Sequence, residues 1–262
     1  MNMNCETMNG ASRRAGLGNG ASWEPGSGGL VYNEELMPFT VKIVRSQAEL
    51  AKAVQIRHAA YARHVPELAK LLRDAEAYDY EEGSVVLLAE SKLDGAPLGT
   101  MRIQTNFHRP LPLEGSVELP DWLQGRSLAE ATRLGVKEGG IGRVVKVMLY
   151  KAFFFYCLGE KVNWMVVAGR TPVDRQYESL LFSDVFPGKG YIPLRHIGNI
   201  PHRVLAFEPS SAEKRWAEAK HPLFDFIFRT SHPDIDLTDV ARNSFPSPRR
   251  AGTLAATAEA CV

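Results

Sequence analysis

Two spacings of hydrophobic residues alternate along the chain. Short runs with apolar residues at every second position are typical of β-strands, and longer runs with apolar residues at every third or fourth position are typical of amphipathic helices. The first spacing predicts strands at residues 39–46, 84–91, 98–106, 128–136, 163–170 and 202–209. The second predicts helices at residues 46–65, 66–77, 142–161, 172–186 and, around a break at Pro222, 215–230.

Cap and turn residues indicate how these elements connect. Ser46 and Glu49 have the spacing of a helix capping box, and Leu93-Asp94-Gly95 is a turn that joins the strands on either side of it into an antiparallel hairpin. The order of elements is strand, helices, hairpin, strand, long helix, strand, helix, strand. It predicts an α/β (α+β) fold in which helices pack on both faces of a mixed central sheet.

Composition separates a central domain from two polar ends. Residues 1–38 are rich in Gly, Ser and Asn, and residues 238–262 are rich in Pro, Ser and small side chains, so both ends are predicted to be disordered. Residues 39–237 are predicted to form one domain without internal repeats. With 45% hydrophobic residues, this part of the chain is long enough to bury a sizeable core.

Charge and motifs exclude several classes of protein. The formal net charge of +1 gives no overall attraction for nucleic acid, and no apolar run reaches the roughly 18 residues that span a bilayer. The three cysteines and seven histidines show no metal-ligand spacing, and no GxSxG, HExxH or GK[ST] motif occurs. We therefore expect a cytoplasmic protein with no metal, no nucleic-acid partner and no stable membrane insertion.

A glycine-rich loop links the predicted strand 128–136 to the long helix. The loop Lys137-Glu138-Gly139-Gly140-Ile141-Gly142 lets backbone amides approach a ligand, and amides at a helix N-terminus favour an anion. In this position it resembles the R/Q-x-x-G-x-G/A loop of the GNAT acyltransferases, with Lys in the first place. The resemblance implies a GNAT-like fold in which Lys137, Gly140, Gly142 and Arg143 bind the phosphate of a pantetheine arm.

Scattered charged residues resemble a narrower group, the acyl-homoserine lactone synthases. These enzymes have an early Arg with an aromatic residue four positions later, a Tyr-Asp pair, a hairpin Arg and a Glu-x-x-Arg strand motif. The matching positions here are Arg57 with Tyr61, Tyr78-Asp79, Arg102, and Glu130 with Arg133. Tyr61 replaces their Phe, and residues 64–68 lack the tryptophan that usually follows. This difference implies a different amine acceptor.

Residues 41–237 resemble the bacterial long-chain N-acyl amino acid synthases more closely, and the run 221–237 is similar to the end of their domain. The resemblance implies transfer of a long-chain acyl group from acyl carrier protein to the α-amine of an amino acid, tyrosine in the type case. It implies no tightly bound cofactor. The co-substrate is an acyl-phosphopantetheine thioester on acyl carrier protein or coenzyme A. A lactone synthase and a non-catalytic acyl-carrier-binding module are the alternatives.

The resemblance also assigns roles to charged residues. Glu130 is either a general base, acting directly or through water, or one half of a structural ion pair with Arg102 or Arg133. Arg57, Asp79, Arg102 and Arg133 either take part in catalysis or order the N-terminal helices against the sheet.

Further roles concern the thioester and the acceptor. Backbone N–H groups near Leu134 to Val136 are expected to polarise the acyl carbonyl. Tyr177 either protonates the leaving thiolate or is a half-buried helix residue. Arg170 either binds the acceptor's carboxylate or lies on the surface, and Arg195 is a weaker candidate for the same role.

Two features of the long helix also have two interpretations. Arg143, Lys146 and Lys151 form either a docking patch for acidic acyl carrier protein or an ordinary solvated face. The aromatic run Phe153–Tyr156 belongs to the core, to an acyl tunnel, or to both.

Overall fold

The computed structural model describes residues 33–238, so the predicted disorder of residues 1–32 and 239–262 lies outside the described residues. For residues 33–38 that prediction is wrong. Strand β1 (Asn33–Glu34) pairs in parallel with β10 (Thr230–Ser231), and the Met37 amide donates to Asp234 Oδ2 over 2.7 Å. The folded part of the chain therefore includes residues before the predicted boundary at residue 39.

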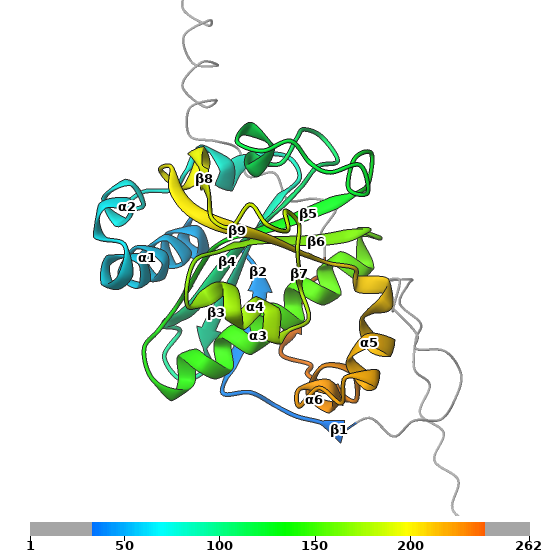
Figure 1. Ribbon diagram of the computed structural model, residues 1–262. Coiled ribbons are helices and arrows are strands. Elements are labelled where there is room, and N and C mark those ends of the chain that lie inside the picture. The colour runs from blue at the N-terminus through cyan, green and yellow to red at the C-terminus, as the bar shows by residue number, and fades with distance from the viewer. Residues whose placement is uncertain (1–32, 239–262) are drawn as a thin grey trace, which may run out of the picture.

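A nine-stranded mixed sheet forms the centre of the described chain (Figure 1). Its order is β11-β2-β3-β4-β5-β6-β9-β7, with β8 pairing to β9; only β11–β2 and β5–β6 are parallel. The strands are β2 (Phe39–Ile43), β3 (Ser84–Ser91), β4 (Pro97–Thr105), β5 (Leu128–Val136), β6 (Trp164–Gly169), β7 (Ser183–Asp184), β8 (Ile192–Leu194), β9 (Ile200–Phe207) and β11 (Ile235–Asp236).

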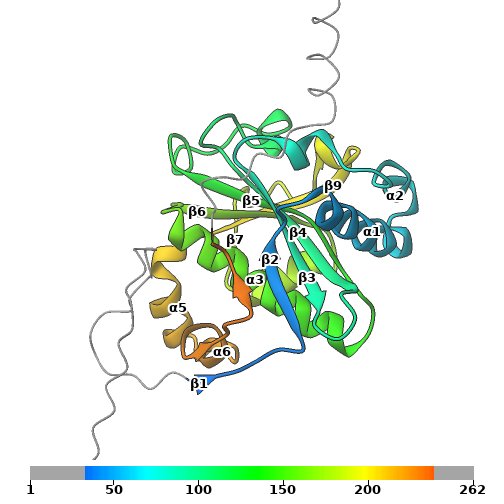
Figure 2. The ribbon, with the colours of Figure 1, turned by 180° about the vertical axis from the view of Figure 1, so that it is seen from behind.

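Helices cover both faces of this sheet, as predicted (Figures 1 and 2). One face carries α1 (Gln47–His64) and α2 (Pro66–Leu71), and the other carries α3 (Gly140–Gly159), α4 (Val173–Ser179), α5 (Ala212–Glu218) and α6 (Phe224–Phe228). Short 3-10 turns η1 (Ala77–Tyr80), η2 (Pro112–Gly115), η3 (Arg195–Ile197) and η4 (Pro209–Ser211) complete the chain. Two glycines allow close helix packing. A Cβ on Gly99 would lie 2.5 Å from Val145 of α3, and one on Gly135 would lie 3.1 Å from Ala60 of α1.

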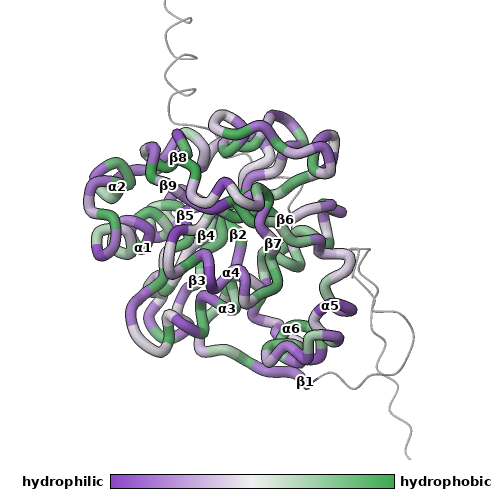
Figure 3. The backbone as a smooth tube through the Cα atoms, viewed as in Figure 1, coloured by the Kyte–Doolittle hydropathy of each residue, from purple (hydrophilic) through white to green (hydrophobic). Residues whose placement is uncertain are grey.

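Hydrophobic residues concentrate in the central strands and in α3 (Figure 3). The larger core cluster lies between the sheet and α3, and a second cluster lies on the opposite face beneath α2, η2 and η3. No helix among residues 33–238 is long and apolar enough to cross a bilayer.

Several element boundaries differ from the predicted ones. The strands at 84–91 and 128–136 match the prediction at both ends. The predicted helix 172–186 stops at Ser179, because Leu181 has a φ of +66° and the chain then enters β7. At the start of α1, Ser46 Oγ accepts the Glu49 amide, but the Glu49 carboxylate accepts the Arg45 amide, so the capping box is displaced by one residue.

A β-bulge lies in β5 where it pairs with the antiparallel strand β4, in the middle of the sheet. Thr100 pairs with Gly135 and Arg102 pairs with Thr132, so β5 has one residue more than β4 in this interval. Within it, Arg133 has a φ of +55°, a left-handed conformation that is uncommon for a residue with a side chain. The β5–β6 pairing ends at Ala131, while β5 stays paired with β4 as far as Val136. Beyond the bulge, β5 and β6 therefore diverge.

Candidate active site

A pocket of about 490 Å³ lies where β5 and β6 diverge. Its walls come from α1 and α2 on one face of the sheet, from α3 and α4 on the other, and from the segment 197–202. The ionisable side chains in its lining are Tyr61, His64, Arg133, Lys146, Arg170, Tyr177 and His202. The lining contains no Asp or Glu, so it favours a ligand with a negatively charged group.

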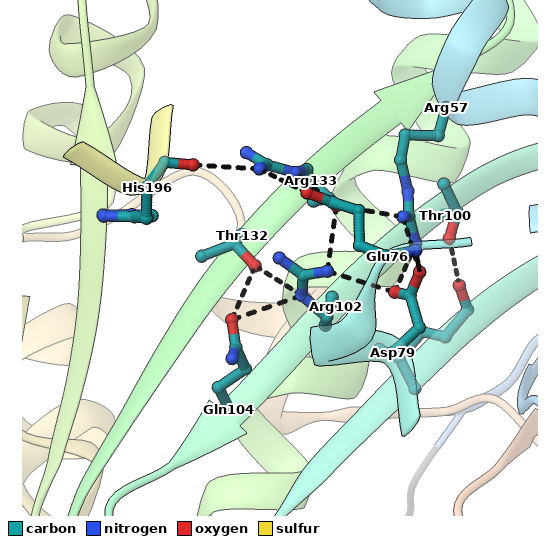
Figure 4. Close-up of polar contacts among 10 residues, drawn as sticks. Arg57, Glu76, Asp79, Thr100, Arg102, Gln104, Thr132, Arg133 and His196 are labelled. Carbon is teal, nitrogen blue, oxygen red and sulfur yellow. Dashed lines mark hydrogen bonds and ion pairs between the residues drawn. The ribbon is translucent and has the colours of Figure 1, made fainter. Parts of the chain in front are cut away.

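Next to the pocket lies a buried group that we call the arginine–carboxylate cluster: Arg57, Glu76, Asp79, Arg102 and Arg133 (Figure 4). Arg57 binds both oxygens of Asp79, at 2.9 and 2.8 Å, and Arg133 binds both oxygens of Glu76, each at 2.7 Å. Arg102 bridges the two carboxylates at 3.0 and 3.2 Å. The cluster thereby joins α1, η1, β4 and β5.

The charges in this cluster hold both carboxyl groups ionised. Burial alone would raise the pKa of Glu76, but the hydrogen bond from Arg133 and the charges of the three arginines outweigh burial and lower it. The pKa of Asp79 is lowered in the same way, chiefly by Arg57. Only Arg133 of the five lines the pocket. The other four residues contact one another and Arg133 rather than the pocket.

Glu76 was not among the residues selected from the sequence, although it contacts all three arginines of the cluster. It lies three residues before Asp79, whose carboxylate accepts the Glu76 amide. The stretch around them contains further acids at Asp74 and Glu81. Spacing alone therefore could not select the acidic residue that faces the arginines.

Glu130 lies apart from the cluster and from the pocket lining. Its side chain is fully buried opposite Gln104, it accepts the Leu113 amide at 3.3 Å, and its Oε1 lies 3.1 Å from His196 Nε2 without hydrogen-bond alignment. Of the two alternatives for Glu130, the ion pair with Arg102 or Arg133 is not formed, since among the described residues these arginines pair with Glu76 and Asp79, and the ionisable neighbour of Glu130 is His196.

His196, which sequence reasoning missed, connects Glu130 to the pocket wall. Its imidazole contacts Glu130. Its backbone oxygen accepts from the Arg133 guanidinium at 3.0 Å, as Figure 4 shows. Glu130 therefore reaches the pocket only through neighbouring residues.

On the opposite wall, α3 and α4 contribute Lys146 and Tyr177. Lys146 Nζ donates to Gln176 Oε1 over 2.6 Å, and burial lowers the pKa of Lys146. Tyr177 is 4% exposed, more buried than expected, and burial raises its pKa, so its hydroxyl stays protonated at neutral pH.

Tyr177 also lines a second, apolar cavity of about 40 Å³ beneath α5 and α6. The cavity wall includes Phe153, Phe154 and Trp216. The first two residues of the aromatic run are therefore core residues that border an internal space. Tyr177 stands between this space and the larger pocket.

The glycine loop lies at the start of α3, beside the pocket residue Val136. Gly139 has a φ of +89°, and a Cβ on Gly142 would lie 1.7 Å from the Lys137 carbonyl oxygen, so position 142 requires glycine. Lys137, Gly140 and Arg143 are exposed, and no side chain caps the first turn of α3. These features give an accessible helix N-terminus with two basic side chains beside it.

Two other predicted site residues lie in β5, one within the bulge and one at the end of the strand. Leu134 and Val136 both line the pocket, and the Val136 carbonyl oxygen accepts from Arg63 at 2.7 Å. The strand segment expected to face the thioester carbonyl therefore borders the pocket.

Arg143, Lys146 and Lys151 do not form one exposed group on α3, so neither the docking patch nor the solvated face holds for all three. Lys151 is 1% exposed, and its Nζ donates to the carbonyl oxygens of Phe226 and Thr230, each at 2.6 Å, and lies 2.8 Å from His232 Nδ1. Lys151 therefore holds the segment after α6 against the helix. Lys146 is half-buried in the pocket, which leaves Arg143 as the exposed base of the three.

Arg170 follows β6 at the pocket rim and is exposed. Its guanidinium has no hydrogen-bond or ion-pair partner among the described residues, so it is available to a ligand. Arg195 does not line the pocket.

His202, a second residue that sequence reasoning did not select, lies in the pocket wall contributed by β9.

A mixed sheet with a central bulge, diverging parallel strands and a glycine loop leading into a long helix is the GNAT-like acyltransferase fold. No protein-family model matches the sequence, and no curated protein matches it. The chain is similar to the structure of FeeM, an N-acyl amino acid synthase from uncultured soil microbes. The two share 17% sequence identity with a TM-score of 0.55, over 69% of this chain and 96% of FeeM. This similarity confirms the fold implied by the sequence.

Structures of two acyl-homoserine lactone synthases are also similar. LasI has 15% identity and a TM-score of 0.44, over 65% of this chain and 90% of LasI. BjaI, a CoA-dependent enzyme solved with SAM and isopentyl-CoA, has 15% identity and a TM-score of 0.46, over 74% of this chain and 93% of BjaI.

Proposed function

We propose that this protein is an N-acyltransferase that moves a long-chain acyl group from acyl carrier protein to the α-amine of an amino acid. The observation that carries the proposal is the pocket between the diverging strands. Its ionisable lining is basic or phenolic, it lies beside the glycine loop, and the unpaired guanidinium of Arg170 stands at its rim.

The donor occupies the α3 side. The exposed N-terminus of α3, with Lys137 and Arg143 beside it, suits the phosphate of a phosphopantetheine arm. The same two side chains are the contacts we propose for the acidic carrier protein. The arm then enters the pocket past Val136 and Leu134, where backbone amides near the bulge polarise the thioester carbonyl.

The acceptor occupies the side formed by α1, α2 and β9. Arg170 binds its carboxylate, because a guanidinium pairs with a carboxylate through two hydrogen bonds and Arg170 has no partner of its own within the described chain. A lining without acids disfavours S-adenosylmethionine, whose sulfonium and ammonium groups outnumber its one carboxylate. This difference supports an ordinary amino acid over the lactone synthase alternative.

Other residues complete the proposed reaction. Tyr177, kept protonated by burial, gives its proton to the leaving thiolate. The arginine–carboxylate cluster and the Glu130–His196 contact hold Arg133 and the wall around it, so Glu130 acts as a positioning residue.

The test compares two amines as acceptors. Purified protein is mixed with acyl carrier protein that carries a long-chain acyl group, and release of the carrier thiol is measured. Tyrosine is expected to react and tyramine, which lacks the carboxylate, to react poorly. Arg170→Ala is expected to raise KM for tyrosine at least about tenfold and to leave the rate with tyramine unchanged, since one bidentate charged contact contributes about 1.5–3 kcal/mol. Lactone formation from S-adenosylmethionine, or binding of the carrier without acylation of any amine, would overturn the proposal.

A further inference from the structure

His202 lines the acceptor side of the pocket and has one ring nitrogen without a hydrogen-bond partner among residues 33–238. It is 8% exposed and lies on β9, and its Nδ1 is 2.8 Å from the Ile200 carbonyl oxygen. A carbonyl oxygen only accepts hydrogen bonds, so Nδ1 carries the proton of the neutral ring and Nε2 keeps a free lone pair. Among residues 33–238, Nε2 has no hydrogen-bond partner.

The surroundings of His202 keep the ring neutral. Burial lowers the pKa of His202 most, the hydrogen bond to the Ile200 carbonyl oxygen opposes this effect, and electrostatic interactions with Arg170, His196 and Arg133 lower the pKa further, so it lies below the usual value. These groups come from the rim after β6, from η3 and from β5, and the pocket adds Tyr61 and His64 from α1. No carboxylate in the lining opposes them.

The remaining ionisable groups in the lining are less suited to accept a proton. Arginine stays charged, and Tyr177 is held protonated by burial. The side chain of Lys146 already donates to Gln176. Glu130 lies outside the lining, and His64 is exposed.

We propose that His202 is the general base that takes the proton from the acceptor amine. This assignment rests on the acyl transfer proposed above. The amine enters as an ammonium ion and loses one proton to His202 Nε2. Its freed lone pair forms the N–C bond with the thioester carbonyl carbon, and the C–S bond breaks. As the intermediate collapses, Tyr177 gives its proton to the sulfur, so that a thiol leaves, and the second amine proton replaces the one lost from Tyr177. His202 then returns the first proton to water.

Two variants separate this role from a structural one. His202→Asn keeps an amide N–H close to the position of Nδ1, so it can still donate to Ile200, but it lacks the nitrogen at Nε2. His108→Asn is the matched control, because His108 is an exposed histidine outside the pocket. Thermal unfolding establishes that each variant is folded, and His202→Gln replaces His202→Asn if the latter is not.

The measurement is kcat/KM for the amine against pH. Wild type and His108→Asn are expected to lose activity as pH falls through a pKa below the usual histidine value. His202→Asn is expected to lose about 10²–10⁴-fold at neutral pH. Its rate should also recover as rising pH deprotonates the free amine, and added imidazole should restore part of it.

The outcomes distinguish the two proposals. A wild type without turnover contradicts the acyltransferase function. If wild type is active and a folded His202→Asn keeps both the wild-type rate and the loss of activity at low pH, the role of His202 is overturned. If the loss of activity at low pH disappears in Glu130→Gln but remains in His202→Asn, the role of His202 is also overturned and the base is Glu130.

Discussion

Replacing Glu76 with glutamine tests whether the arginine–carboxylate cluster holds the pocket wall. Three guanidinium groups and two carboxylates give the buried cluster a net charge of +1, which the variant raises to +2. In wild type, each of the two Glu76 oxygens accepts a hydrogen bond from Arg133 at 2.7 Å. Glutamine keeps the side-chain length and one oxygen, but its NH₂ group cannot accept from the second Arg133 N–H donor. Removing one partner of a buried ion pair costs about 3–5 kcal/mol.

The assay is thermal unfolding of wild type, Glu76→Gln and the surface control Glu67→Gln. For a domain of this size, about 3–5 kcal/mol corresponds to a Tm decrease of about 6–20 °C. Glu67 forms an exposed i,i+3 pair with Lys70, so its variant is expected to unfold close to wild type. A Tm for Glu76→Gln as close to wild type as that of the control would refute the view that the cluster orders this wall.

The pH dependence of protein stability tests the role of the cluster independently. Because the pKa values of Glu76 and Asp79 are lowered in the folded protein, their contribution to stability is complete above the unfolded values of 4.5 and 3.8. It is lost as the pH falls through the lower folded values. Glu76→Gln should therefore lose less stability than wild type on acidification below about pH 4.5.

Two further predictions concern α3. Gly142→Ala is expected to raise KM for the acyl donor at least about tenfold, because its Cβ would lie 1.7 Å from the Lys137 carbonyl oxygen. Gly159→Ala, at the other end of α3, adds a Cβ that would meet nothing within 4 Å and should stay near wild type. Equal KM values for the two variants would contradict the loop assignment. Lys151→Met leaves two buried carbonyl oxygens without a donor and should cost about 2–4 kcal/mol, with faster hydrogen exchange at residues 230–236; unchanged exchange would contradict the anchoring role.

Much of the fold could be predicted from hydrophobic spacing, because strands buried on both faces and amphipathic helices leave strong local patterns. The strands 84–91 and 128–136 are correct to the residue. The helix predicted at 172–186 was too long, because the left-handed turn at Leu181 and the pairing of β7 with β9 depend on the tertiary structure. Strand β1 was missed because two residues that pair with β10 carry no periodicity.

The candidate site was less accessible from the sequence. The glycine loop could be found because a positive φ or a close backbone approach requires glycine, which is visible in the sequence. The bulge at Arg133 could not be found, because an arginine gives no sign that its φ is positive. The burial of Lys151 depends on carbonyl oxygens roughly 75 residues away along the chain. His196 and His202 lack the spacing of any motif, and only the sheet places them beside β5 and the pocket.

The most direct test of the proposed function is mass spectrometry of lipid extracts from cells that produce wild type, Gly159→Ala or Gly142→Ala. New N-acyl amino acids are expected with wild type and Gly159→Ala and should be strongly reduced with Gly142→Ala, and their masses would identify the acceptor and the acyl chain length. No new acylated amine with wild type, in cells where the protein is folded and acyl carrier protein is present, would contradict the acyltransferase function and favour a carrier-binding module.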